Sequence, residues 1–137
     1  MGWEHFHHQA DIGIRGVANT LEHAFEQGAT ALMAVICTPK KVQPEQTIEI
    51  ECHAAEKDLL FADWINALIY EMDIRKMLFG KFEVRIENNK LTGTAWGEKV
   101  DTDRHELAVE VKAATFMELK VFQNEQNQWV AQCVVDV

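Results

Sequence analysis

Two aspartates stand in otherwise apolar surroundings near opposite ends of the 137-residue chain. Asp11 lies between Ala10 and Ile12, and Asp136 is followed by Val137. A carboxylate in an apolar strand is costly to bury unless a positive charge meets it. If the first and last strands lie side by side, both side chains and the carboxylate of Val137 converge, and a hard divalent cation would relieve their repulsion. The alternative is that both chain ends are frayed and solvated.

Three histidines, His5, His7 and His8, precede Asp11. Successive side chains of a strand point to opposite faces, so His5 and His7 share a face and His8 points the other way. Two imidazoles on one face could hold a soft or borderline metal ion. The simpler interpretation, which we favour, is a solvated strand edge with one hydrogen-bonded histidine.

A second polar cluster spans residues 101–106, with His105 among acidic residues and Arg104. An acid and a histidine together can perform general acid–base chemistry. The alternative is an ordinary polar loop in which Asp103 bonds the backbone of the following residues. Further along, Lys112 stands among small residues, from which a lysine can reach a phosphate or a carboxylate.

The charge balance argues against direct, tight binding to nucleic acid. The chain has 22 acidic and 13 basic residues, a net charge of −9, and no basic run longer than Lys40-Lys41. Tight nucleic-acid binding requires a concentration of lysine and arginine. No apolar run approaches the roughly 20 residues that span a bilayer. Three scattered cysteines form no metal or disulfide pattern and are expected to be buried thiols in a cytoplasmic protein.

The periodicity of apolar residues predicts one α+β domain over residues 1–137. Two helices are expected, the first capped by Thr20 and ended by Pro39, and the second over residues 58–76, central and buried on most sides. About seven mostly antiparallel strands complete the sheet on which the helices pack. The expected strands are two halves of residues 3–17, residues 47–54, a hairpin of 82–87 and 91–96 around Asn88-Asn89, and a hairpin of 118–122 and 129–137.

The chain resembles the archease family along nearly its whole length. The order and spacing of its motifs carry the resemblance, because each motif alone is unspecific. The matching segments are His8-Gln9-Ala10-Asp11-Ile12-Gly13-Ile14, Thr20-Leu21-Glu22-His23-Ala24-Phe25, Asp63-Trp64-Ile65-Asn66-Ala67-Leu68-Ile69-Tyr70, Gly97-Glu98, Asp103-Arg104-His105, Glu110-Val111-Lys112-Ala113-Ala114-Thr115, Trp129-Val130-Ala131-Gln132 and Asp136-Val137.

The resemblance implies a function that the residues alone do not name. Archeases assist the guanylylating RtcB-type RNA ligase of tRNA splicing and RNA repair, promoting its guanylylation and multiple turnover, and they are not themselves enzymes. The resemblance also implies a divalent cation held at Asp11, Asp136 and Val137, with calcium expected in crystals and magnesium or manganese as alternatives. Arg104 and His105, together with Lys112, become candidate contacts to the ligase.

The sequence departs from the family pattern at Gln9, where threonine is common, and at Phe116-Met117, where tyrosine and histidine are common. These changes remove polar groups from the expected partner face and leave the metal-binding set intact. Two alternatives stay open. One is a small metal-dependent hydrolase using Asp11, Asp136 and His105, although no activated nucleophile is evident. The other is a chaperone-like binding module.

Overall fold

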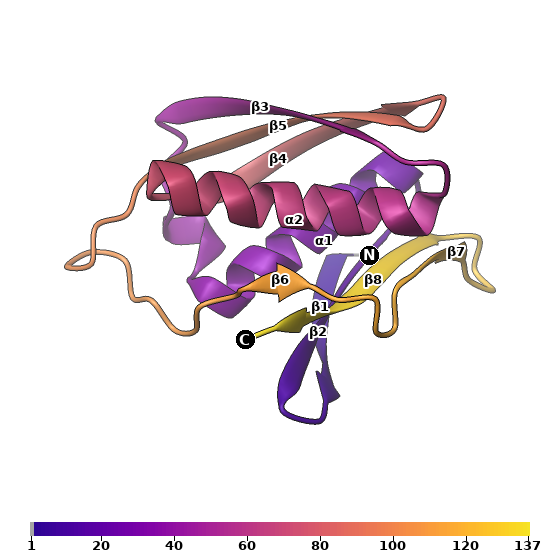
Figure 1. Cartoon of the computed structure of the whole chain (residues 1–137), viewed down its shortest axis with the longest axis horizontal. Coiled ribbons are helices and arrows are strands. Elements are labelled where there is room, and N and C mark those ends of the chain that lie inside the picture. Colours follow the sequence, from indigo (N-terminus) through magenta and orange to yellow (C-terminus); the bar gives the residue numbers. More distant parts are fainter. Residues whose placement is uncertain (1) are drawn as a thin grey trace.

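Two β-sheets enclose two helices in the computed structural model, which describes residues 2–137 (Figure 1). The elements in chain order are β1 (Gly2–His8), β2 (Asp11–Ala18), α1 (Leu21–Ile36), the short 3-10 helix η1 (Pro39–Lys41), β3 (Gln46–His53), α2 (Lys57–Arg75), β4 (Met77–Glu87), β5 (Lys90–Lys99), β6 (Ala113–Ala114), β7 (Lys120–Gln123) and β8 (Trp129–Asp136). The predicted α+β class, with two main helices on antiparallel strands, is confirmed.

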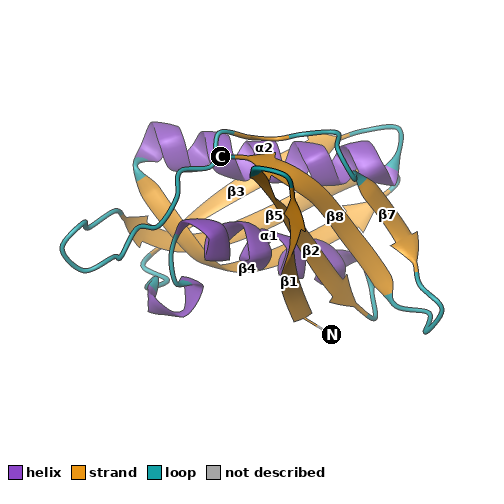
Figure 2. Cartoon of the chain, turned by 90° about the horizontal axis from the view of Figure 1, so that it is seen from below, coloured by secondary structure: helices purple, strands orange, loops and turns teal. Residues whose placement is uncertain are grey.

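One sheet has the strand order β1-β2-β8-β6, with β7 also paired to β8, and the other has the order β3-β5-β4. Every strand pair is antiparallel. Helix α1 contacts β2 of the first sheet and β4 of the second, so it lies between the two sheets. Figures 1 and 2 show the same arrangement from two directions, with β8 lying alongside β2 of the first hairpin. The second strand, β2, and the last strand, β8, are therefore neighbours, and β1 lies on the other side of β2.

Helix α1 begins where its capping residue predicts. The Thr20 side chain accepts a hydrogen bond from the His23 N–H at 3.1 Å, which satisfies one of the free donors of the first turn. The helix ends at Cys37, before Pro39 starts η1. A Cβ on Gly16 of β2 would lie 2.2 Å from the Ala24 carbonyl oxygen, so α1 rests directly on the backbone of β2.

Helix α2 is anchored by Trp64, whose indole N–H donates to the Phe25 carbonyl of α1 at 3.1 Å. Its predicted polar stripe is solvent-exposed. That stripe comprises Asp63, Asn66, Tyr70 and Asp73. The expectation that the helix is buried on most sides is wrong for its last turns, where the side chain of Ile74 is 52% exposed. Asp73, Ile74 and Arg75, the last three residues of the helix, are all exposed.

The predicted turn between β4 and β5 is confirmed. Asn88 and Asn89 both adopt positive φ angles, 49° and 63°, as the tight two-residue hairpin connection requires. The three cysteines, Cys37, Cys52 and Cys133, are free and buried, as expected, and burial raises the pKa of their thiols to about 11, 11 and 12 respectively. Across residues 2–137, no helix has the length and apolar character needed to cross a membrane.

Candidate functional site

The pairing of β2 with β8 brings Asp11 and Asp136 together. Ile12 pairs with Val135 in this antiparallel ladder, so the next position outward sets Asp11 opposite Asp136. Directly opposed residues of antiparallel strands project from the same face, with Cβ atoms roughly 5 Å apart. Asp11 is half-buried and Asp136 is exposed. Two carboxylates therefore face solvent from adjacent strands at one end of the sheet.

The two aspartates lie on the face of the sheet away from the helices. Ile14 is fully buried in the core, and Gly16, two residues on, contacts α1, so these residues define the inner face of β2. Gly13 belongs to the opposite face, where a Cβ would lie 2.3 Å from the Phe6 ring. Asp11, two residues before Gly13, shares this outer face because side chains alternate along a strand.

The end of β8 is held by hydrogen bonds and is not frayed. The Lys112 N–H donates to the Asp136 carbonyl oxygen at 2.8 Å, and Ala113 of β6 pairs with Asp136. The Thr115 N–H and hydroxyl each lie 2.9 Å from the Val134 carbonyl oxygen. Val137 is half-buried and packs against the core. The alternative of solvated, frayed chain ends is therefore wrong for β8, because β2 and β6 hold it on both sides.

The histidines of β1 separate as the strand alternation predicts. His5 Nε2 lies 2.8 Å from the Ala31 carbonyl oxygen of α1, which makes His5 the expected hydrogen-bonded histidine. His7 is exposed. His8 pairs directly with Asp11 across the β1–β2 hairpin, and its Nδ1 is buried without a hydrogen-bond partner. The sequence analysis assigned no role to His8. A two-residue turn between His8 and Asp11 would have indicated that the two side chains lie opposite each other.

The outer row of His8, Asp11 and Asp136 is suited in part to a hard cation. Paired carboxylates supply the oxygen ligands that calcium and magnesium prefer. Within residues 2–137, no three or more His, Cys, Asp or Glu side chains gather closely enough to hold a metal ion. The predicted set contains only two such side chains, because its third group is the main-chain carboxylate of Val137.

A different cluster surrounds Glu98, which is 4% exposed. Its carboxylate accepts hydrogen bonds from the Gln43 N–H at 2.7 Å, from the Arg104 guanidinium and from His105 Nε2 at 2.9 Å. The guanidinium, aided by these N–H donors, holds the pKa of Glu98 well below its usual range although burial opposes the shift. His105 Nδ1 accepts from the Asp101 N–H at 2.9 Å, so Nε2 carries the proton given to Glu98.

These contacts change the interpretation of the loop after β5. Arg104 and His105, predicted to contact a partner, are bonded within the chain, and His105 is 3% exposed. Asp101, and not Asp103 as predicted, bonds the backbone of the residues that follow it. Its side chain accepts a hydrogen bond from the Asp103 N–H at 3.1 Å, and its carbonyl accepts one from the His105 N–H. Glu98, the centre of the cluster, was not predicted: Arg104 and His105 follow it by only six and seven residues, but local spacing does not reveal that the loop folds back onto it.

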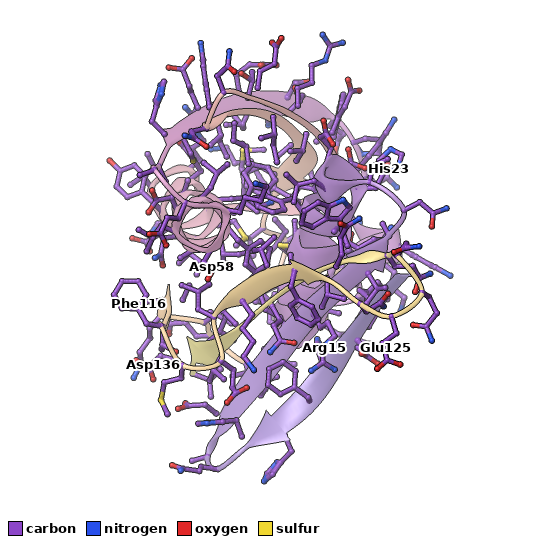
Figure 3. The ribbon with its side chains drawn as sticks, turned by 90° about the vertical axis from the view of Figure 1, so that its right-hand side faces the viewer. Arg15, His23, Asp58, Phe116, Glu125 and Asp136 are labelled. Carbon is purple, nitrogen blue, oxygen red and sulfur yellow. The ribbon has the colours of Figure 1, made fainter. Side chains whose placement is uncertain are left out.

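The remaining predicted contacts lie on the surface beside Asp136. Lys112 is exposed, and it lines an open groove of about 750 Å³ between the second half of α2 and residues 107–112. Phe116 is 76% exposed at the outer edge of the same sheet, and Figure 3 shows it with Asp136 on one side of the molecule. The Met117 carbonyl accepts from the Val134 N–H at 3.0 Å. Gln9 forms the exposed β1–β2 turn with a φ of 53°.

Comparison with known proteins accounts for nearly all of the chain. The Archease protein family (MTH1598/TM1083) matches residues 3–137. The chain belongs to the archease family. Similar proteins named archease come from Pyrococcus furiosus, 41% identical, and Pyrococcus abyssi, 40% identical; each alignment covers 98% of both chains. The resemblance inferred from the motifs is thereby confirmed.

Two solved structures have the fold of this archease. The solution structure of protein 1598 from Methanobacterium thermoautotrophicum superimposes with a TM-score of 0.87 and 31% identity, covering 99% of both chains. A crystal structure from Thermotoga maritima, described as an archease and possible chaperone, gives a TM-score of 0.66 at 21% identity, covering 96% of this chain and 94% of that one. At that identity the second comparison supports the fold alone.

Proposed function

We propose that this archease is a non-catalytic accessory protein that activates an RtcB-type RNA ligase, promoting guanylylation and multiple turnover in tRNA splicing or RNA repair. Membership of the family supports the accessory role. The net charge of −9 supports action through the ligase protein rather than through tight binding of RNA. Lys112, exposed beside Asp136, and Arg104, whose side chain is 41% exposed, are the candidate contacts to the ligase that lie on the surface.

We further propose a divalent cation at Asp11, Asp136 and the carboxylate of Val137. The observation that carries this proposal is the opposed placement of Asp11 and Asp136 on one face of the sheet. Like charges directly opposite one another destabilise an antiparallel pair, and a cation between them removes that penalty. Calcium, magnesium and manganese all accept such oxygen ligands, and a bound ion would supply positive charge at a surface that otherwise repels anions.

The hydrolase alternative loses its proposed base in this geometry. It required His105 beside Asp11 and Asp136, but both ring nitrogens of His105 are already hydrogen-bonded, to Glu98 and to the Asp101 backbone. A general base must reach the proton that it abstracts. The chaperone alternative stays open: the Thermotoga maritima structure is described as a possible chaperone, but at 21% identity it supports the shared fold only.

A ligase turnover assay tests the accessory role. The RNA substrate is supplied in excess over an RtcB-type ligase, with and without this archease, and both guanylylated ligase and joined RNA are measured. We expect the archease to convert a single round of ligation into many rounds, and to join no RNA by itself. Asp63→Asn, a change on the exposed stripe of α2, serves as the control variant. Equal ligation with and without the archease would contradict the proposal.

A further inference from the structure

Among residues 2–137, one buried side-chain polar atom has no hydrogen-bond partner, and it belongs to His8. The atom is Nδ1, on the imidazole side chain at the end of β1. Buried polar atoms in folded proteins almost always have a partner, so an isolated one calls for an explanation. His5, on the same strand, shows the usual outcome, because its Nε2 lies 2.8 Å from a carbonyl oxygen of α1.

The position of His8 supplies that explanation. His8 pairs with Asp11, and Asp11 in turn stands opposite Asp136, so the three side chains form one row across β1, β2 and β8. Residues directly opposed in antiparallel strands project from the same face. His7 points to the other face and is exposed. The unpartnered nitrogen thus belongs to the face that carries the two carboxylates.

The chemistry of the row favours contact through water over direct ligation by nitrogen. His8, Asp11 and Asp136 are not close enough together to form a three-side-chain metal site. Hard cations such as calcium and magnesium prefer oxygen ligands and commonly keep bound waters. A water bound to a cation is a strong donor, and an imidazole nitrogen without a proton is an acceptor. Residues that bond ligands of a metal in this way orient them and tune affinity.

We propose that His8 is a positioning residue whose Nδ1 accepts a hydrogen bond from a water bound to the cation at Asp11 and Asp136. This inference rests on the cation site of the proposed function. It extends that site to β1 and assigns a role to the hairpin turn at Gln9 and Ala10. The turn places His8 and Asp11 opposite each other across adjacent strands.

Three variants separate this role from a structural one. His8→Leu removes the acceptor, whereas His8→Asn keeps an oxygen at the position of Nδ1. His7→Leu makes the same change on the other face of β1. Titration calorimetry with manganese and with calcium is expected to show a loss of affinity of about 10-fold or more for His8→Leu, as for other residues that support metal ligands. The cation affinity of His8→Asn is expected to stay within roughly 3-fold of that of the unmodified protein, since its acceptor remains. His7→Leu is expected to bind the cations as tightly as the unmodified protein.

The outcomes distinguish this inference from the proposed cation site. If the unmodified protein binds neither ion, the cation site and the role of His8 are both rejected. If it binds and His8→Leu binds equally well, only the role of His8 is rejected. Pulsed electron paramagnetic resonance of manganese bound to the unmodified protein needs no variant. We expect no directly coordinated nitrogen, and the strong nitrogen coupling of a direct ligand would overturn the water-mediated arrangement.

Discussion

Asp11 of β2 and Asp136 of β8 occupy opposed positions at the end of one antiparallel ladder, on the face of the sheet away from the helices. Neither carboxylate forms an ion pair with a lysine, arginine or histidine of residues 2–137. Lys112 contacts Asp136 through its backbone N–H only. Among residues 2–137, no cationic side chain therefore compensates these two carboxylates, and the cation proposed above is the basis of the first two predictions.

Asp11→Asn and Asp136→Asn are each expected to weaken cation binding by about 10-fold or more, because ligand charge sets affinity for hard cations. In the presence of a chelator, both variants should unfold at the same temperature as the unmodified protein or a higher one, since removal of one carboxylate relieves repulsion. Calorimetric titration and thermal unfolding measure the two effects. Asp63→Asn is the control. Unchanged cation affinity in either variant would remove that aspartate from the site.

Extension of the chain beyond Val137 is expected to weaken cation binding. A few added residues convert the carboxylate of Val137 into a neutral amide and place bulk beside Asp136. The same residues added before Met1 should leave affinity unchanged, because β1 separates that end from Asp11 along the chain. Cation affinity and stimulation of ligase turnover are compared in both forms. Equal behaviour of the two would exclude Val137 and leave only the aspartates as ligands.

Glu98→Gln is expected to destabilise the protein at neutral pH by about 1–3 kcal/mol, because the donors of Gln43, Arg104 and the buried His105 lose an ionised acceptor. The lowered pKa fixes the direction of the pH dependence. The stabilisation from Glu98 is fully present above the ordinary carboxyl range and is lost as the pH falls below it toward the lowered value. The difference in stability between the unmodified protein and the variant should therefore shrink in acid.

Urea unfolding at neutral pH and in acid measures this difference. Glu87→Gln, at an exposed carboxylate at the end of β4, is the matched control and should have a small effect at both pH values. Equal stability of Glu98→Gln and the unmodified protein at neutral pH would show that the Glu98 cluster does not hold the loop after β5.

Two glycines of β2 should respond differently to alanine. At Gly16 a Cβ would lie 2.2 Å from the Ala24 carbonyl oxygen and 2.3 Å from the Gly28 nitrogen, which are backbone atoms of α1. Gly16→Ala must push the helix off the sheet and should cost about 3 kcal/mol or more. At Gly13 the obstacle is the Phe6 ring, a side chain that can rotate, so Gly13→Ala should cost only about 1 kcal/mol. Denaturant midpoints compare the two, and equal costs would contradict this account.

The sequence alone determined the local elements. The Thr20 hydroxyl caps α1 from within its own first turn, and Asn88-Asn89 supply the left-handed conformations of the β4–β5 turn. Such contacts join residues close in sequence, so their pattern can be read without the fold. The alternation around Ile48, Ile50 and Cys52 likewise identified the buried face of β3. The family motifs placed Asp11 and Asp136 in the candidate site.

Only the tertiary structure decided which of the candidate side chains meet. Pairing of β2 with β8 opposes Asp11 and Asp136, and the loop after β5 turns His105 inward onto Glu98. The family resemblance had made His105 a candidate contact to a partner, and the sequence could not correct this because a histidine in a charged loop looks the same whether it faces solvent or a buried carboxylate. Local periodicity reports which face of a strand is buried, whereas the register between strands far apart in sequence depends on the packing of the whole core.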